Sequence, residues 1–251
     1  MNRFFVEADR IRDSLVEITG EDAVHILRVL RLGVGDLIEV CDGAGMDYPA
    51  TIIKTNKNWL KVKLGEGGPS KGEPHTRVTL YQGIPKSSKM DFVIQKCVEL
   101  GVHRIVPLET ARTITDLSDT KKASKRVARW QKIAREAAKQ SKRGIVPTID
   151  VPMTFFQAIM QATHCAKILF WEDERELDLK RYLDERDSKD KIECKDIGII
   201  IGPEGGLDDQ EVQLARENGW DTITLGKRIL RTETAGMAAL AAIMFYMGEM
   251  K

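Results

Sequence analysis

The sequence predicts an α/β protein in which a mostly parallel sheet follows a small, mostly β domain. Two regions of different pattern predict this arrangement. Apolar runs alternate with helical patterns after residue 75, whereas short alternating or β-branched runs dominate before residue 65. Strands that alternate with helices are typical of βα units on a parallel sheet. A segment rich in glycine and proline separates the two regions, and 251 residues are enough for two domains.

The separating segment is Gly65–Pro74, whose four glycines and two prolines cannot sustain a helix or a strand. It predicts one domain over residues 1–70 and another over residues 75–251. In the first domain we expect short strands and one short helix, which indicate a small, mostly β barrel. The strands are Asn2–Val6, Asp36–Cys41, Tyr48–Lys54 and Asn58–Leu64, and the helix is Glu21–Leu30.

The second domain contains five apolar runs that predict strands and five periodic segments that predict helices. The strands are Val78–Tyr81, Arg104–Leu108, Lys167–Phe170, Ile197–Ile201 and Thr222–Leu225. The helices are Lys89–Leu100, Ser124–Ser141, Thr154–Gln161, Asp208–Glu217 and Glu233–Tyr246.

The composition excludes several classes of protein. Hydrophobic residues make up 42% and charged residues 31%, which excludes a disordered chain. The longest apolar candidate, Ala235–Met247, is shorter than the roughly 18 to 20 residues that cross a bilayer, so we expect no membrane span. The N-terminus lacks the apolar core of a signal peptide, so we expect a cytoplasmic protein. The four cysteines form no metal-binding pattern, so we expect reduced structural thiols and no metal.

The net charge of +1 conceals a strongly basic helix. Residues 121–143 hold ten Lys or Arg and one acid, Glu136. Five of the cations share one helical face, and such a stripe suits a phosphate backbone because bound phosphates release counterions. The alternative is an ordinary solvated face, although solvated faces usually mix both signs. The five are Lys125, Arg129, Lys132, Lys139 and Arg143.

Two loops between strands and helices are candidates for a ligand site. Ligands of open α/β sheets bind beyond the carboxyl ends of the strands, where glycines let the backbone approach them. The loop Gly202–Leu207 contains three glycines, but it is neither a P-loop nor a dinucleotide-binding fingerprint. The loop Leu225–Gly236 brings three cations and an acid to the start of a helix of small residues. The alternatives are a plain strand-to-helix turn and a buried core helix with solvated charges at its start.

A weaker signal lies in the first domain, where His25 and Arg28 share a helical face close to Arg31. A lone histidine is more often a packed or surface residue than a binding residue. Together with the two loops, the basic helix and the segment Lys86–Gly101, these residues nonetheless resemble one family. It comprises the bacterial small-subunit ribosomal RNA uridine-N3 methyltransferases known as RsmE, within the SPOUT class. The resemblance covers nearly the whole chain.

The resemblance implies a PUA-like β-barrel over about the first 70 residues and a SPOUT domain with a trefoil-knotted, mostly parallel sheet. It also implies S-adenosylmethionine as cofactor, bound mainly by the backbone of three loops. The implied cofactor-binding residues are Trp171, Glu172, Gly202, Pro203, Glu204, Gly205, Gly206, Leu225, Gly226, Ile229, Leu230 and Arg231. The implied RNA-binding residues are His25, Arg28, Arg31, Lys86, Lys89, Arg129, Lys132, Lys139 and Arg143.

By the same resemblance, the substrate is 16S ribosomal RNA or the assembled small subunit, and the protein is a homodimer. Uracil N3 carries a proton, which must be removed before N3 can be methylated. Removal of this proton leaves negative charge on the uracil, and an arginine is suited to stabilise it. We expect Arg231 to face the uracil and Glu233 or Glu204 to orient it. The alternative function is a non-catalytic RNA-binding or ribosome-assembly protein. An NAD- or NTP-dependent enzyme is disfavoured by the missing fingerprints.

Overall fold

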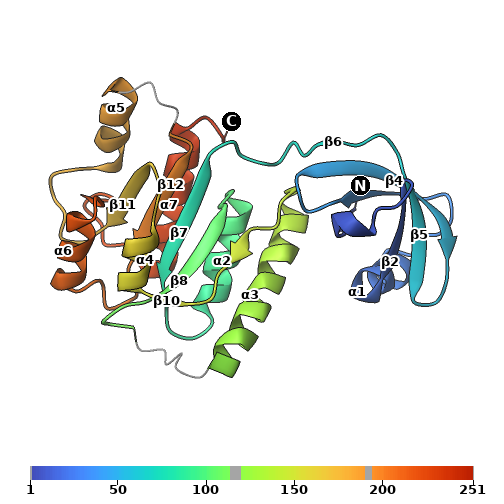
Figure 1. Ribbon diagram of the computed structural model, residues 1–251, viewed down its shortest axis with the longest axis horizontal. Helices are drawn as coiled ribbons and strands as arrows, with labels where there is room; N and C mark the ends of the chain where they lie inside the picture. Colours follow the sequence, from blue (N-terminus) through green and yellow to red (C-terminus); the bar gives the residue numbers. More distant parts are fainter. Residues whose placement is uncertain (1, 114–119, 190–193, 251) are drawn as a thin grey trace. The chain divides into compact units, whose positions relative to one another are not determined.

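A computed structural model of the protein describes residues 2–113, 120–189 and 194–250 (Figure 1). The chain divides into two compact units. One comprises Met1–Glu73 with Ala138–Val146, and the other comprises Pro74–Ala137 with Pro147–Lys251. The division at Glu73 lies within the expected linker. The short piece 138–146 differs from the expectation, since it includes the last residues of the basic helix yet packs with the first unit.

The first unit contains a six-stranded sheet in which β1, β3, β4, β5 and β2 are neighbours in that order and β6 pairs with β4. The β1–β3 pair is parallel and the other pairs are antiparallel. The sequence predicts four of these strands but misses β2, and two residues of the linker form β6. The strands are β1 (Arg3–Phe5), β2 (Leu15–Thr19), β3 (Leu37–Cys41), β4 (Met46–Thr55), β5 (Trp59–Leu64) and β6 (Gly68–Pro69).

The core of the first unit follows from side chains that alternate between the two faces of these strands. Val16 and Ile18 of β2 are buried, whereas their neighbours in the strand are exposed. The expected helix Glu21–Leu30 forms as two pieces, α1 (Gly20–Val24) and a π-helical turn, η2 (His25–Val29). A short 3-10 turn, η1 (Ala8–Arg10), precedes β2.

The second unit contains a seven-stranded sheet whose pairs are all parallel. Its order is β10-β8-β7-β12-β11-β13, and β9 pairs with β8. This confirms the predicted α/β class with a mostly parallel sheet. The strands are β7 (Arg77–Gly83), β8 (Arg104–Glu109), β9 (Thr148–Ile149), β10 (Met153–Thr154), β11 (Ala166–Phe170), β12 (Asp196–Ile201) and β13 (Asp221–Ile223).

Helices cover this sheet. Helices α2 and α7 contact each other, and α7 contacts β7 and β12, while α4 contacts α6 and β8. The small residues of α7 permit close packing, since a β-carbon at Gly236 would lie 3.2 Å from Oε1 of Gln82 on β7. All the predicted helices are present, and α5 was not predicted. The helices are α2 (Lys89–Glu99), α3 (Thr120–Gln140), α4 (Phe155–Gln161), α5 (Leu179–Lys189), α6 (Asp209–Glu217) and α7 (Thr232–Tyr246).

The register of the sheet brings three strand ends together. Phe170, the last residue of β11, pairs with Ile201 of β12 and Ile223 of β13, which are also the last residues of their strands. Three loops therefore leave the sheet side by side at one edge. In open α/β sheets this edge is where ligands bind.

Candidate active site

A cavity of about 480 Å³ opens where β11, β12 and β13 end. Its volume lies in the range of small-molecule sites. All three predicted loops line it, and of the residues expected to bind a cofactor only Gly205 is outside the lining. The expected residues that line the cavity are Trp171, Glu172, Gly202, Pro203, Glu204, Gly206, Leu225, Gly226, Ile229, Leu230 and Arg231.

The loop after β11 is held by the half-buried carboxylate of Glu174. Glu174 accepts a hydrogen bond of 2.6 Å from the hydroxyl of Thr222, and its other oxygen accepts from the backbone N–H groups of Arg175 and Glu176. Burial raises the pKa of Glu174, but these hydrogen bonds outweigh it and the pKa is lowered. The ring of Trp171 packs 5.3 Å from the guanidinium of Arg216. The loop is thus fixed from both sides.

The loop after β12 turns sharply next to the first loop. Gly206 has a φ of +71°, and a β-carbon there would lie 2.1 Å from Oε1 of Glu172. Only glycine fits this position without displacing the carboxylate. A β-carbon at Gly205 would instead lie 3.1 Å from Cβ of Arg112, whose guanidinium donates to the Gly205 carbonyl. The side of Gly205 therefore faces Arg112.

The loop after β13 is tied to the other strand ends through Thr232. The Thr232 hydroxyl donates a hydrogen bond of 2.6 Å to the carbonyl oxygen of Gly202 and accepts one of 2.8 Å from the amide of Gln82. Both Thr232 and Gln82 are buried. The start of α7 is thereby fixed to the ends of β12 and β7. Within the same loop Ile229 is 86% exposed, so it offers apolar surface at the cavity mouth.

A lysine at the start of α2 joins two acids at this cavity. Nζ of Lys89 lies 3.0 Å from Oε1 of Glu204 and 3.4 Å from Oε2 of Glu233. Glu204 also accepts hydrogen bonds from the backbone N–H of Lys86. Burial raises the pKa of Glu204, but the hydrogen bonds from Lys89 and the backbone lower it overall. The hydrogen bond to Glu204 raises the pKa of Lys89. Both groups therefore stay charged at neutral pH.

Arg231 is exposed, lines the cavity and caps the N-terminus of α7. Its carbonyl oxygen accepts hydrogen bonds of 2.8 Å from the N–H groups of Thr234 and Ala235. Within the described residues no ion pair or side-chain hydrogen bond involves its guanidinium. Glu204 and Glu233, which were expected to orient Arg231, both pair with Lys89. The backbone of Arg231 is fixed while its side chain remains available to a ligand.

The basic helix α3 presents only part of its predicted stripe. Lys125, Arg129 and Lys132 are exposed, and the guanidinium of Arg129 pairs with Asp91 on α2. Lys139 is mostly buried, with its Nζ 2.7 Å from Oδ1 of Asp22.

Arg143 does not belong to the exposed stripe. Its side chain is 3% exposed, and its guanidinium binds both carboxylate oxygens of Glu73 at 3.2 and 2.9 Å. Its carbonyl oxygen accepts a hydrogen bond of 2.6 Å from Arg3. The helix ends at Gln140 and Lys142 has a φ of +59°, so helical periodicity does not extend to Arg143. Its role is structural, within the first unit.

The remaining expected RNA-binding residues divide between the units. His25, Arg28 and Arg31 are exposed on the first unit. Lys86 is exposed next to the cavity loops, and Lys89 belongs to the acid-bound cluster described above.

The cysteines differ from the sequence-based expectation of four reduced thiols. Cys165 and Cys194 form a disulfide bond. Their separation of 29 residues gave no signal of pairing, because the pairing follows from the parallel alignment of β11 and β12. Cys41 and Cys97 are free and buried. The described residues contain no cluster of His, Cys, Asp and Glu that could hold a metal ion, and no described helix is long and apolar enough to cross a membrane.

Sequence reasoning missed several residues of the cavity wall. Lys89 was assigned to RNA rather than to the acids that it joins, because its partners lie more than 100 positions away. The others are strand ends or loop neighbours of the predicted residues, which is the signal that could have found them. They are Phe170, Arg175, Ile201 and Thr224, whereas Lys227, Arg228, Thr232 and Ala235 lie within the predicted loop Leu225–Gly236 but were not expected to bind the cofactor individually.

Comparison with known proteins identifies the family. An RNA methyltransferase domain matches residues 72–244, and an RNA methyltransferase PUA domain matches residues 18–65. The ribosomal RNA small subunit methyltransferase E of Bacillus subtilis is 35% identical over 98% of this chain and 96% of its own length. The chain belongs to the RsmE family. The RsmE protein of Buchnera aphidicola is 31% identical over 99% of this chain and 95% of its own length.

Solved structures of RsmE-like proteins share the fold over nearly the whole chain. The RsmE protein of Neisseria gonorrhoeae, bound to S-adenosyl methionine, matches with a TM-score of 0.84 and 32% identity over 98% of both chains. A methyltransferase from Legionella pneumophila in complex with SAM matches with a TM-score of 0.85 and 28% identity over 97% of both chains.

Proposed function

We propose that the protein uses S-adenosylmethionine to methylate N3 of a uridine in 16S ribosomal RNA. The observation that carries the proposal is the in-register ending of β11, β12 and β13, from which three loops enclose one cavity in a chain of the RsmE family. Ribosomal RNA is made in the cytoplasm of bacteria, and we place the protein there.

The residues that line the cavity match the chemical groups of S-adenosylmethionine. Ile201, Leu225 and Leu230 line the cavity and offer apolar contacts for an adenine ring. The carboxylate of Glu172 beside Gly206 suits the cationic parts of the cofactor. Pro203 lacks an N–H donor and Glu204 is ionised, so the second loop is unsuited to phosphates, which this cofactor lacks. When bound, the cofactor supplies an electrophilic methyl group.

The chain's own contribution to catalysis is electrostatic. Loss of the N3 proton leaves negative charge on the carbonyl oxygens of uracil, and preorganised donors stabilise such charge without reorganising. Arg231 suits this role because its backbone is fixed and its guanidinium lines the cavity. Lys89 pairs with Glu204 and Glu233 and holds both carboxylates in place, which makes it a positioning residue for the second loop and for α7.

The RNA would be held by cations outside the cavity. Exposed Lys125, Arg129 and Lys132 on α3 suit phosphates, whereas Arg143 is buried and serves the fold instead. His25, Arg28 and Arg31 offer further polar surface on the first unit. The target base must leave its stack to reach a recessed methyl donor, and an unpaired region of 16S RNA or of the small subunit makes this inexpensive.

We also propose that the first unit is a PUA-like barrel and that the second contains the trefoil knot of the SPOUT class. Support for the knot comes from Thr232, which follows β13 in the chain yet bonds to Gly202 after β12 and to Gln82 of β7. When the chain is stretched mechanically between residues 74 and 251, its final length should then be shorter than that of a fully extended chain. Full extension would exclude the knot.

We further propose a homodimer. On α7, Phe245 is 73% exposed although the helix is apolar on nearly all sides, and Phe92 on the contacting helix α2 is 46% exposed. Exposed aromatic residues on adjoining helices favour burial by a second chain.

Methylation assays test the proposed reaction. The full-length protein is incubated with S-adenosylmethionine carrying a labelled methyl group, and with either 16S RNA or isolated small subunits that lack the modification. Label at N3 of one uridine in either substrate is the expected result. Calorimetric titration that detects binding of RNA but none of S-adenosylmethionine would overturn the proposal and favour a non-catalytic RNA-binding protein.

A further inference from the structure

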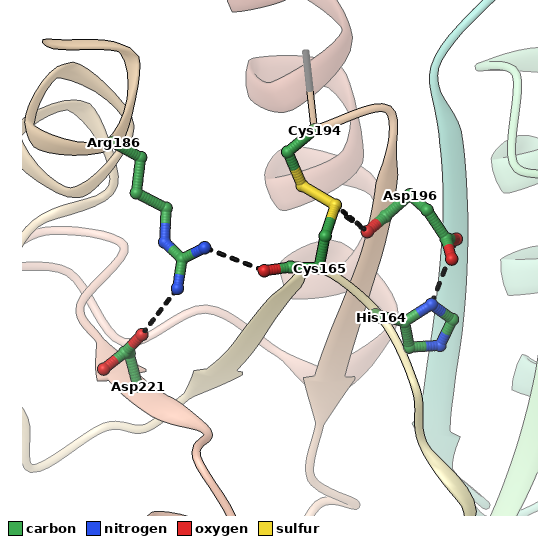
Figure 2. The surroundings of a disulfide bond; sticks show 6 residues. All are labelled: His164, Cys165, Arg186, Cys194, Asp196 and Asp221. Atoms are coloured by element: carbon green, nitrogen blue, oxygen red, sulfur yellow. Dashed lines mark hydrogen bonds and ion pairs between the residues drawn. A yellow bond between two sulfur atoms is a disulfide. The ribbon is translucent and has the colours of Figure 1, made fainter. Parts of the chain in front are cut away.

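Figure 2 shows the disulfide between Cys165 and Cys194, neither of which lines the cavity. Cys165 immediately precedes β11, and Cys194 lies two residues before β12 begins. The cavity loops leave the opposite ends of these strands. The bond therefore closes a ring that contains β11, the first cavity loop and α5.

The accessibility of the two cysteine pairs differs sharply. Cys165 is exposed and Cys194 is half-buried, so external thiols can reach the disulfide. Cys41 and Cys97 are buried, and burial raises the pKa of each thiol to about 12. Since the thiolate is the reactive form of cysteine, these two are inert at neutral pH. Thiol chemistry is therefore confined to the Cys165–Cys194 pair.

The surroundings of the disulfide accommodate both oxidation states. The carbonyl oxygen of Asp196 lies 3.0 Å from Sγ of Cys165 and 3.7 Å from Sγ of Cys194, so it can accept an S–H bond from a thiol after reduction. The guanidinium of Arg186 donates to the Cys165 carbonyl at 2.8 Å and lies 3.6 Å from the carboxylate of Asp221. These contacts hold α5 against the sheet independently of the sulfur atoms, as Figure 2 shows.

The region around the disulfide is also connected to the core of the second unit, through the side chain of Asp196. The carboxylate of Asp196 bonds to Nδ1 of His164 at 3.1 Å, and Nε2 of His164 bonds to the hydroxyl of Tyr81 at 3.0 Å. Tyr81 belongs to the core of the second unit and packs edge-on against Trp220. His164 lies on Gly198 of β12, where a β-carbon would approach its ring within 2.4 Å. The fold at this point therefore has supports that survive loss of the disulfide.

We propose that Cys165–Cys194 is a thiol–disulfide exchange site whose co-reactant is a cellular thiol, either a small monothiol or a dithiol protein. A thiolate of the reductant attacks Sγ of exposed Cys165, the S–S bond breaks, and Cys194 leaves as a thiolate that takes a proton from water. A second reductant thiol then displaces Cys165. The protein gains two electrons and two thiols, and two reductant thiols are oxidised to one disulfide.

The first test counts thiols on the full-length protein. Protein treated with oxidised glutathione, then denatured and alkylated, should carry two labels, on Cys41 and Cys97. Treatment of the folded protein with reduced glutathione, or in a separate arm with reduced thioredoxin, followed by alkylation before denaturation, should label only Cys165 and Cys194. Reduction by either reductant supports the site, and the arm that succeeds identifies the source. Four labels in the oxidised sample, or no reduction by either reagent in the folded protein, would overturn the proposal.

The second test measures the effect on the fold. A disulfide that closes a ring of this size stabilises the folded state, so the oxidised protein should melt about 5 to 15 °C above the reduced one. The variant with both Cys165→Ser and Cys194→Ser should have the melting temperature of the reduced protein, and glutathione should not change it. Amide hydrogen exchange should quicken in α5 on reduction and stay unchanged in α2. Equal melting temperatures for the oxidised protein and the double variant would contradict the exchange site, and neither measurement depends on methyl transfer.

Discussion

A β-carbon placed on Gly206 would lie 2.1 Å from Oε1 of Glu172, so the loop after β12 occupies the space directly beside a carboxylate of the loop after β11. Gly206→Ala must displace that carboxylate and also adopt a φ of +71°. We expect it to weaken S-adenosylmethionine binding about tenfold or more, equivalent to about 1.4 kcal/mol. Calorimetric titration measures the affinity, and circular dichroism checks the fold.

Gly205→Ala is the matched control for this change. Its β-carbon would meet Cβ of Arg112 at 3.1 Å, and Gly205 is outside the cavity lining. We expect its cofactor affinity to stay within about threefold of the unaltered protein, a difference below 1 kcal/mol. An equal loss in both variants would show that the close approach of Gly206 to Glu172 has no special part in binding.

Replacing Lys89 by Gln should change how the protein responds to acid. The pKa of Glu204 in the folded protein lies below its ordinary value of 4.5. Ionised Glu204 therefore stabilises the folded state above pH 4.5, and this stabilisation is lost as the pH falls through the lowered pKa. Without Lys89 the pKa of Glu204 should rise, and this acid-dependent part of the stability should shrink. Melting temperatures between about pH 3 and 6 measure the effect.

Lys86→Gln controls for the loss of one positive charge, since only the backbone of Lys86 bonds to Glu204. Its melting profile should match that of the unaltered protein. If the two glutamine variants behave alike, the link between Lys89 and Glu204 does not govern the titration.

Arg231→Ala should lose methyl transfer far more than cofactor affinity. The substitution keeps the backbone that holds the loop, and it removes a guanidinium used chiefly as charge develops on the uracil. Removal of one preorganised donor typically costs about 100- to 1,000-fold in rate. Single-turnover methylation measured beside cofactor affinity distinguishes the roles, and parallel losses in both would assign Arg231 to loop structure.

Charge reversal on α3 should weaken RNA binding. In the double variant Arg129→Glu and Lys132→Glu we expect lower affinity for any RNA sequence and a flatter dependence on salt, because phosphate contacts release counterions. Cofactor affinity should be unchanged. If the salt dependence of RNA binding is identical to that of the unaltered protein, the cations of α3 form an ordinary solvated face and do not contact RNA.

Arg143→Ala should instead destabilise the fold. It leaves the half-buried carboxylate of Glu73 without the buried guanidinium that binds it, and breaking a fully buried ion pair costs about 3 to 5 kcal/mol, which sets the upper end of the expected loss. Denaturant unfolding measures this loss. If the variant has normal stability but binds RNA poorly, Arg143 contributes to RNA binding rather than to the fold.

Phe245→Asp tests the dimer. A carboxylate on the exposed apolar part of α7 would be costly to bury against a second chain, so light scattering should report a monomer at concentrations where the unaltered protein is dimeric. An unaltered protein that is itself monomeric and fully active would remove the need for a dimer.

Local pattern was sufficient to predict the parallel sheet and two of the loops that line the cavity. Parallel strands end at one edge, so the loops after β12 and β13 could be assigned to a ligand site without knowledge of their contacts, whereas the loop after β11 was assigned only through the resemblance to the RsmE family. The strand β2 was missed although Val16 and Ile18 alternate with exposed neighbours, because the run is short and lies next to polar turns.

The contacts that pattern could not predict join positions far apart in the chain. The pairing of Lys89 with Glu204 and Glu233 depends on how α2 lies beside α7, and the Cys165–Cys194 bond depends on strand register. The position of Arg143 was wrong because helical periodicity was extended past Gln140, where the backbone turns at Lys142. Each of these contacts is set by tertiary packing rather than by local propensity.

The return of residues 138–146 to the first unit has a consequence for how the chain can be divided. The backbone passes between the units three times, so neither unit is a single uninterrupted stretch that a protease or a gene truncation could release whole. A cut within residues 65–73 would nick the chain while Arg3, on the N-terminal fragment, still donated a hydrogen bond to the carbonyl oxygen of Arg143 on the C-terminal fragment. The linker that divides the sequence is therefore not a point at which the folded protein comes apart.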